Sequence, residues 1–190
     1  WQSKMNKITY GRQTINQDDI DEVIKALKSP AITQGEYVPA FENALKEYTG
    51  AKYAVAVSSG TAALHTAYAA LGLKQNDEII TCPNTFAATS NAALYLNAKP
   101  KFADINADDF LIDENKINPL ITKNTKIITP IHYAGLTCNM EEINKTAKNH
   151  NIKIVEDACH ALGSYYKNSK TGSCEYSDAA VFSFHPVKHI

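Results

Sequence analysis

The sequence predicts an α/β fold, a three-layer sandwich in which a mainly parallel β-sheet is covered by helices on both faces. Short apolar runs typical of buried strands alternate with segments whose apolar residues recur at helical spacing. Strands that alternate with helices form parallel sheets with right-handed crossovers. With 190 residues and 44% hydrophobic content, the chain can bury the core of one such domain.

Two amphipathic helices should precede the sheet. The first is expected to begin after Asn16, a favourable N-cap, and to end at Ser29-Pro30. The second is expected from about Val38 to Tyr48, because Gly50 just beyond it suits a helix C-terminus.

The alternation of strands and helices should begin at the apolar run Tyr53–Val57, followed by a helix that ends before Gly72. Asn139, with Glu142 three residues on, indicates the start of a later helix. Further strands are expected at residues 78–82, 100–103, 126–131, 152–156 and 179–184, and further helices at residues 85–96, 113–120 and 140–150.

We assign residues 16–190 to this domain and residues 1–15 to an N-terminal extension. Trp1–Lys4 are interpreted as tag residues ahead of a natural Met5. No apolar stretch approaches the roughly 20 residues that cross a bilayer, and the N-terminus carries no hydrophobic signal segment. We therefore expect a cytoplasmic protein.

Charge and cysteine usage exclude several kinds of site. The 19 Lys and Arg residues nearly balance the 20 Asp and Glu residues without forming a basic run, so neither nucleic acid nor a membrane surface is expected as a partner. The four cysteines lie far apart, with no C-x-x-C pair and no His at a zinc-finger interval, so we expect reduced thiols and no metal. Cys159 is interpreted as a small buried filler.

Two reactive side chains are placed where apolar strands end. Asp157 closes the run 151–156, where an unpaired buried carboxylate would be costly, and Lys188 lies just beyond the apolar run 179–184. In a parallel sheet, ligands gather at the carboxyl ends of the strands. An anion facing a protonated ring nitrogen and an imine-forming amine are what pyridoxal 5′-phosphate requires. A salt bridge or a helix-capping role for Asp157, and a surface position for Lys188, are the alternatives.

A phosphate site is indicated beside this pair. Ser59-Gly60-Thr61 bridges a strand to a helix, where Gly60 permits close backbone approach and the first N–H groups attract an anion. Ser183 can donate a hydroxyl to the same phosphate as Thr61. An ordinary helix-entry turn at Ser59-Gly60-Thr61 is the competing interpretation.

Two further side chains are candidate cofactor contacts. Phe86 follows the strand that ends at Cys82 and could stack on a planar ring, unless it is a core phenylalanine. His160 lies on the same helical face as Asp157 if a helix starts there, and it could contact the phenolic oxygen or the ring face of the cofactor. A hydrogen-bonded structural histidine is the alternative.

The motifs, taken in order, resemble the fold-type I pyridoxal-phosphate aminotransferases that act on nucleotide-linked keto sugars. The resemblance runs from about Tyr10 to Ile190 and implies the large domain of that fold. It rests on five ordered matches: Ser59–Leu64, Pro83–Phe86, Phe102–Ile105, Glu156–Gly163 and Phe182–Lys188.

The resemblance implies a role for each candidate. Lys188 is the Schiff-base lysine, Asp157 pairs with the ring nitrogen, and Phe86 stacks on the ring. Thr61 and Ser183 bind the phosphate together with backbone groups at Gly60. Many relatives carry Gln at the position of His160.

Within the family, the segments Pro130–Gly135, Cys138–Met140 and His185–Ile190 most resemble the branch that acts in pseudaminic acid biosynthesis. That branch transfers the amino group of L-glutamate to C4 of a UDP-linked 4-keto-6-deoxy sugar. Family members are homodimers with shared active sites and are about twice this long. The small C-terminal domain that covers their site is absent from this sequence, which therefore resembles a fragment.

Two rival functions are kept. A dehydratase branch of the family has His in place of the imine lysine, and Lys188 argues against it. The second rival is a non-catalytic nucleotide-sugar-binding module in which Lys188 and Asp157 merely form a salt bridge.

Overall fold

The five strands of the main sheet run parallel and confirm the expected architecture. The computed structural model describes residues 13–188, so most of the expected N-terminal extension, Trp1–Lys4 included, lies outside the described residues. The strands, in the spatial order β2-β1-β3-β4-β7, are β2 (Lys99–Phe102), β1 (Glu78–Thr81), β3 (Thr125–Ile128), β4 (Lys153–Asp157) and β7 (Ala179–Val181).

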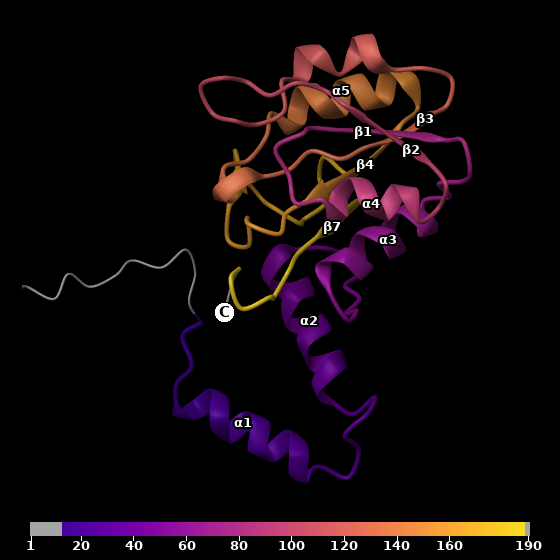
Figure 1. Cartoon of the computed structure of the whole chain (residues 1–190). Helices are drawn as coiled ribbons and strands as arrows, with labels where there is room; N and C mark the ends of the chain where they lie inside the picture. The colour runs from indigo at the N-terminus through magenta and orange to yellow at the C-terminus, as the bar shows by residue number, and fades with distance from the viewer. Residues whose placement is uncertain (1–12, 189–190) are drawn as a thin grey trace, which may run out of the picture.

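Helices cover both faces of this sheet, as Figure 1 shows. Neighbouring residues of a strand point to opposite faces, so each strand supplies both layers of core. Ile80, Ile128 and Ile154 pack in the cluster that contains residues of α5 (Met140–His150). Ile79, Ile127 and Val155 pack on the other face, in the cluster that contains residues of α3 (Gly60–Ala70) and α4 (Ala88–Leu94).

The two N-terminal helices follow their sequence signals. In α1 (Gln17–Lys28), Asn16 and Asp19 form a reciprocal capping box, and Ser29 is the C-cap. α2 (Tyr37–Thr49) ends at Gly50, whose φ of 82° is the left-handed conformation that glycine adopts without strain. No described residue of α1 is buried, so its apolar face is exposed.

The expected strand at Tyr53–Val57 is wrong. Tyr53 and Val55 are each 75% exposed, and the segment joins neither described sheet. A strand needs a neighbour for its backbone N–H and C=O groups, and β7 is the last described strand on its side of the sheet. The Ala56 N–H instead donates to Glu42 Oε1 at 2.8 Å.

Three other elements differ from expectation. The helix at residues 113–120 is a pair of 3₁₀ turns, η1 (Glu114–Lys116) and η2 (Asn118–Leu120), because Pro119 lacks the N–H that a continuous α-helix needs. α4 is shorter than the expected 85–96, since residues 82–87 form the turn that leaves β1. A small unexpected hairpin joins β5 (Tyr165–Tyr166) to β6 (Ser169–Lys170).

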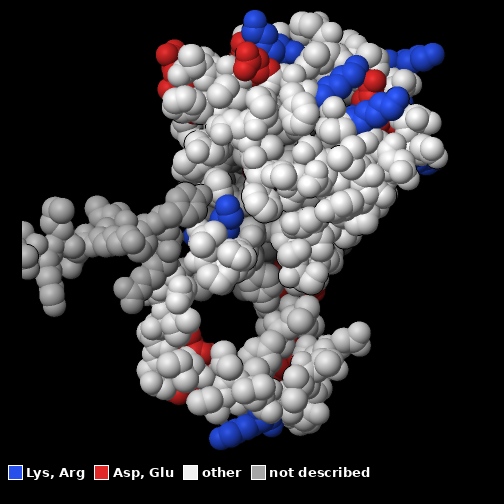
Figure 2. Space-filling model, viewed as in Figure 1, with Lys and Arg blue, Asp and Glu red and all other residues white. Residues whose placement is uncertain are grey.

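Surface charge is mixed on the visible face. Figure 2 shows acidic and basic side chains together at the end of the molecule that carries α5. Within residues 13–188, no helix has both the length and the apolar character needed to cross a membrane.

Candidate functional site

The carboxyl ends of β4 and β7 bring several candidate residues to one edge of the sheet. β4 ends at Asp157, and Ser183 follows β7. α3 begins at Gly60, and a Cβ added there would lie 3.2 Å from the Ser183 Cβ and 3.4 Å from the Cys159 Sγ. Because these neighbours would have to shift for a larger residue, glycine is the residue that fits. Gly60, Ser183 and the chain around Asp157 therefore lie together at this edge of the sheet.

The first turn of α3 offers donors to an anion. Ser59 is the N-cap, and its hydroxyl oxygen accepts a hydrogen bond from the Ala62 N–H at 3.1 Å. The Ser59 hydroxyl hydrogen can still be donated to another group. The N–H groups of Gly60 and Thr61 have no acceptor within the helix and carry the positive end of its dipole. Ser183 is 9% exposed beside them.

The Asp157 carboxylate is buried and anchored through both oxygens. Asp157 is only 5% exposed. Thr89 Oγ1 donates to Oδ2 at 2.6 Å, and the Cys159 N–H donates to Oδ1 at 3.3 Å. The ion pairs among residues 13–188 do not include Asp157, so the salt-bridge alternative is wrong. No helix begins in residues 158–188 that follow it, which also excludes the capping alternative.

Lys188 contacts His160 rather than Asp157. Its Nζ lies 2.6 Å from His160 Nε2, and the Ala134 N–H donates to His160 Nδ1 at 3.3 Å. With Nδ1 accepting, the single proton of a neutral imidazole is on Nε2 and points to the lysine nitrogen. His160 therefore holds the lysine nitrogen in place at this edge of the sheet.

The expected helical face for His160 is wrong. Residues 158–163 form turns, so His160 is directed by this turn and by Ala134 and not by helical spacing from Asp157. The histidine contacts Lys188, and its expected contact with the cofactor stays a prediction.

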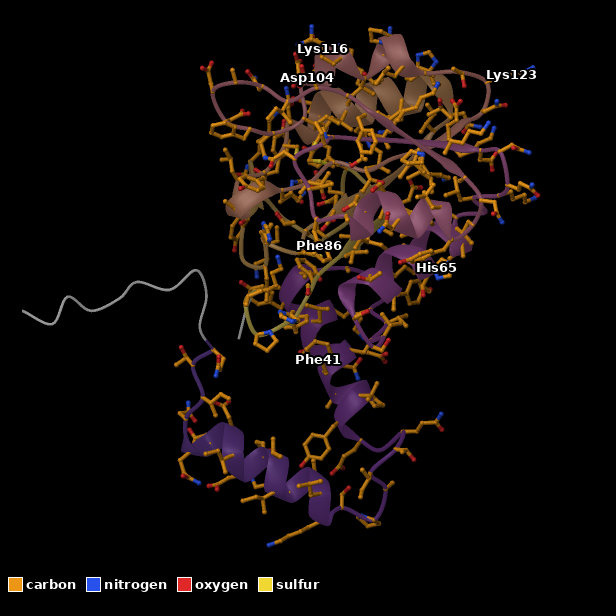
Figure 3. All side chains as sticks on the ribbon, in the orientation of Figure 1. Phe41, His65, Phe86, Asp104, Lys116 and Lys123 are labelled. Atoms are coloured by element: carbon orange, nitrogen blue, oxygen red, sulfur yellow. The ribbon has the colours of Figure 1, made fainter. Side chains whose placement is uncertain are left out.

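Phe86 is 75% exposed, so it is not the core phenylalanine of the alternative interpretation. Figure 3 shows it in the turn before α4, on the side of the molecule towards α2 and the C-terminal segment. An aromatic face in this position is available for stacking on a planar ligand.

Cys159 is only partly buried, at the edge of the core cluster, so the expectation of a buried filler is met only in part. Burial is the main cause that raises the pKa of its thiol, and the neighbouring Asp157 charge adds to the effect. A thiol held protonated is a poor nucleophile. Among residues 13–188, no group of three or more His, Cys, Asp and Glu side chains is arranged to hold a metal ion.

The sequence missed the polar network behind Asp157. Thr89 on α4 contacts Asp157, and Thr85 Oγ1 lies 2.8 Å from Thr89 Oγ1. Two hydroxyls four residues apart at the start of a helix that follows a strand end are the signal that could have indicated them.

Comparison with known proteins identifies the family. The pattern of the DegT/DnrJ/EryC1/StrS aminotransferase family matches residues 13–190. The chain belongs to this family. Its relatives include the UDP-4-amino-4,6-dideoxy-N-acetyl-beta-L-altrosamine transaminase of Campylobacter jejuni subsp. jejuni serotype O:23/36 (strain 81-176), which is 48% identical over 96% of this chain.

Two solved structures of similar proteins superpose on this chain. Helicobacter pylori PseC, an aminotransferase involved in the biosynthesis of pseudaminic acid, has a TM-score of 0.91 and 37% identity, covering 96% of this chain and 49% of that one. Bacillus subtilis NtdA, with bound cofactor PMP, has a TM-score of 0.83 and 33% identity, covering 97% and 43%. The chain spans about half the length of the curated relatives it matches, for example 48% of the Campylobacter enzyme.

Proposed function

We propose that the protein transfers the amino group of L-glutamate to C4 of a UDP-linked 4-keto-6-deoxy sugar in pseudaminic acid biosynthesis, with pyridoxal 5′-phosphate as cofactor. The observation that carries the proposal is the shared site: a buried carboxylate at Asp157, an anion cradle at Gly60 and Ser183, and the amine of Lys188. The named activities of the relatives support the choice of reaction and substrate.

The residues present fit this cofactor. Asp157 is a buried anion without a cationic partner among the described residues, which suits a protonated ring nitrogen. Gly60, Thr61 and Ser183 offer donors to its phosphate, and the exposed ring of Phe86 offers a stacking face. When bound, the cofactor supplies an electron sink for negative charge at the substrate carbon.

Lys188 carries the proton-transfer chemistry in this proposal. With the cofactor bound, Lys188, oriented by His160, would hold it through an imine to its aldehyde and would serve as the base that moves a proton between two carbon atoms. His160 keeps the amine oriented, and Asp157 keeps the ring nitrogen protonated. We further propose a cytoplasmic homodimer whose active sites are shared between subunits.

Two alternatives remain for the test to separate. One is another nucleotide-sugar aminotransferase or dehydratase of the same family. The other is a non-catalytic nucleotide-sugar-binding module, whose proposed salt bridge between Lys188 and Asp157 is replaced by the Lys188–His160 contact.

The test uses protein expressed from the whole reading frame. L-Glutamate alone should bleach the yellow absorbance of the bound cofactor and release 2-oxoglutarate, and the UDP-linked keto sugar should restore the colour and yield a 4-amino sugar. Lys188→Ala should abolish both steps. Lys153→Ala is the matched control, because Lys153 pairs with Asp178 at 2.8 Å elsewhere on the protein.

The outcomes separate the alternatives. Bleaching by glutamate without recovery on the UDP-linked keto sugar would contradict the sugar assignment and favour another nucleotide sugar. A protein that binds the sugar but neither binds pyridoxal 5′-phosphate nor bleaches would contradict the aminotransferase proposal and favour the binding module.

A further inference from the structure

We propose that Thr89 is a positioning residue that fixes the Asp157 carboxylate in the orientation in which it pairs with the cofactor's ring nitrogen. The inference rests on the function proposed above. Thr89 is fully buried near the start of α4, and its Oγ1 lies 2.6 Å from Asp157 Oδ2. An ionised carboxylate only accepts, so the threonine hydroxyl donates, at a distance typical of a charge-assisted O–H···O⁻ bond.

Thr89 is itself held by two hydrogen bonds. Because its own proton goes to Asp157, its oxygen can accept from Thr85 Oγ1, 2.8 Å away, whose proton is also within reach of the Phe86 carbonyl at 3.3 Å. Its backbone carbonyl accepts from the Tyr68 hydroxyl at 3.1 Å, and Thr129 in turn donates to that hydroxyl at 3.0 Å. Burial is the main cause that raises the pKa of Tyr68, so this phenol remains a donor. Thr89 is therefore held beside Asp157 through both its backbone and its hydroxyl.

The carboxylate is consequently held from two elements of the fold. Oδ2 accepts from Thr89 on α4, and Oδ1 accepts from the Cys159 N–H in the turn after β4. Rotation of the carboxylate about its Cβ–Cγ bond would break both bonds. Each oxygen retains a second lone pair, so a ring N–H can be accepted without loss of either anchor.

The experiment measures dissociation constants of the protein expressed from the whole reading frame. The ligands are pyridoxal 5′-phosphate and its 1-deaza analogue, in which C–H replaces the ring nitrogen. Thr89→Val removes the hydroxyl at nearly constant volume, and Thr89→Ser retains it. The control is Thr125→Val, which removes another buried threonine hydroxyl that donates to a carboxylate, Glu78 Oε2 at 3.3 Å, at the opposite end of the strands.

Thr89→Val should weaken binding of pyridoxal 5′-phosphate about tenfold, the scale of one hydrogen bond to a charged group, and leave binding of the deaza analogue unchanged. Thr89→Ser should restore the affinity, and Thr125→Val should change neither ligand. If Thr89→Val does not fold, Thr85→Val removes the hydroxyl that contacts Thr89. This variant should also weaken binding of pyridoxal 5′-phosphate and leave binding of the deaza analogue unchanged.

Two results would overturn the inference. Equal weakening of both ligands would make Thr89 a structural residue only, and unchanged binding of both would remove any role in the site. A wild-type protein that binds neither ligand would instead contradict the proposed function, from which the role of Thr89 follows.

Discussion

Replacing Asp157 with Asn removes the negative charge of this side chain while its hydrogen bonds within the fold can be kept. Asn has nearly the same size, and both anchors can be kept: the Cys159 N–H donates to the amide oxygen, and the Thr89 hydroxyl reverses to accept from the amide NH₂. The Thr89 proton is then free to point to Thr85. The substitution therefore leaves no buried polar group unpaired.

The two expected magnitudes differ accordingly. The free energy of unfolding of the cofactor-free protein should change by less than about 1 kcal/mol, because the hydrogen bonds are exchanged and not lost. The charge-assisted bond to the ring nitrogen is lost, at a cost of about 1.5–3 kcal/mol, which corresponds to a dissociation constant raised about 10- to 150-fold.

The assay pairs a titration of pyridoxal 5′-phosphate, followed by absorbance, with denaturant unfolding of the same cofactor-free preparations. Thr125→Val serves as the control for a buried polar substitution far from the site. If Asp157→Asn binds the cofactor as tightly as the wild type while remaining folded, the pairing of Asp157 with the ring nitrogen is refuted.

Two further predictions concern the anion cradle and pH. Gly60→Ala places a Cβ 3.2 Å from the Ser183 Cβ, so titration should show pyridoxal 5′-phosphate bound about tenfold more weakly and phosphate-free pyridoxal bound unchanged. Equal effects on both ligands would contradict a phosphate site at Gly60. Burial, with a smaller effect of Asp157, raises the pKa of the Cys82 thiol from 9.0 to about 11. The folded state therefore holds this proton more tightly, and stability is lost as pH rises from 9 to 11, by roughly 3 kcal/mol in denaturant unfolding. Cys82→Ala should make that part of the profile less steep, because Cys138, Cys159 and Cys174, whose thiol pKa values are also raised, still contribute to it, and an unchanged slope would contradict the assignment.

Local signals predicted the parts of the fold that depend on neighbours in sequence. The capping box at Asn16, the glycine end of α2 at Gly50 and the α5 helix all follow from short-range hydrogen bonding and periodicity. The expected strand at Tyr53–Val57 failed because a strand depends on a partner elsewhere in the fold.

The site likewise contains residues whose positions follow from local sequence signals and contacts that depend on distant parts of the chain. Parallel pairing brings Asp157 and Ser183 to one edge of the sheet, and strand ends in the sequence were enough to predict this. The contacts of Thr89 with Asp157 and of His160 with Lys188 join residues 68 and 28 positions apart. Such pairs are set by the packing of α4 and of the turn after β4, which no local pattern specifies.

Reduction of the cofactor-loaded protein with borohydride, followed by peptide mass spectrometry, tests the central claim most directly. Borohydride fixes an imine-bound cofactor to its lysine, so the account predicts a phosphopyridoxyl group on Lys188 and none on Lys153 or Lys170. A label on another lysine, or no label on a protein that binds pyridoxal 5′-phosphate, would contradict the claim that Lys188 is the imine-forming amine of this site.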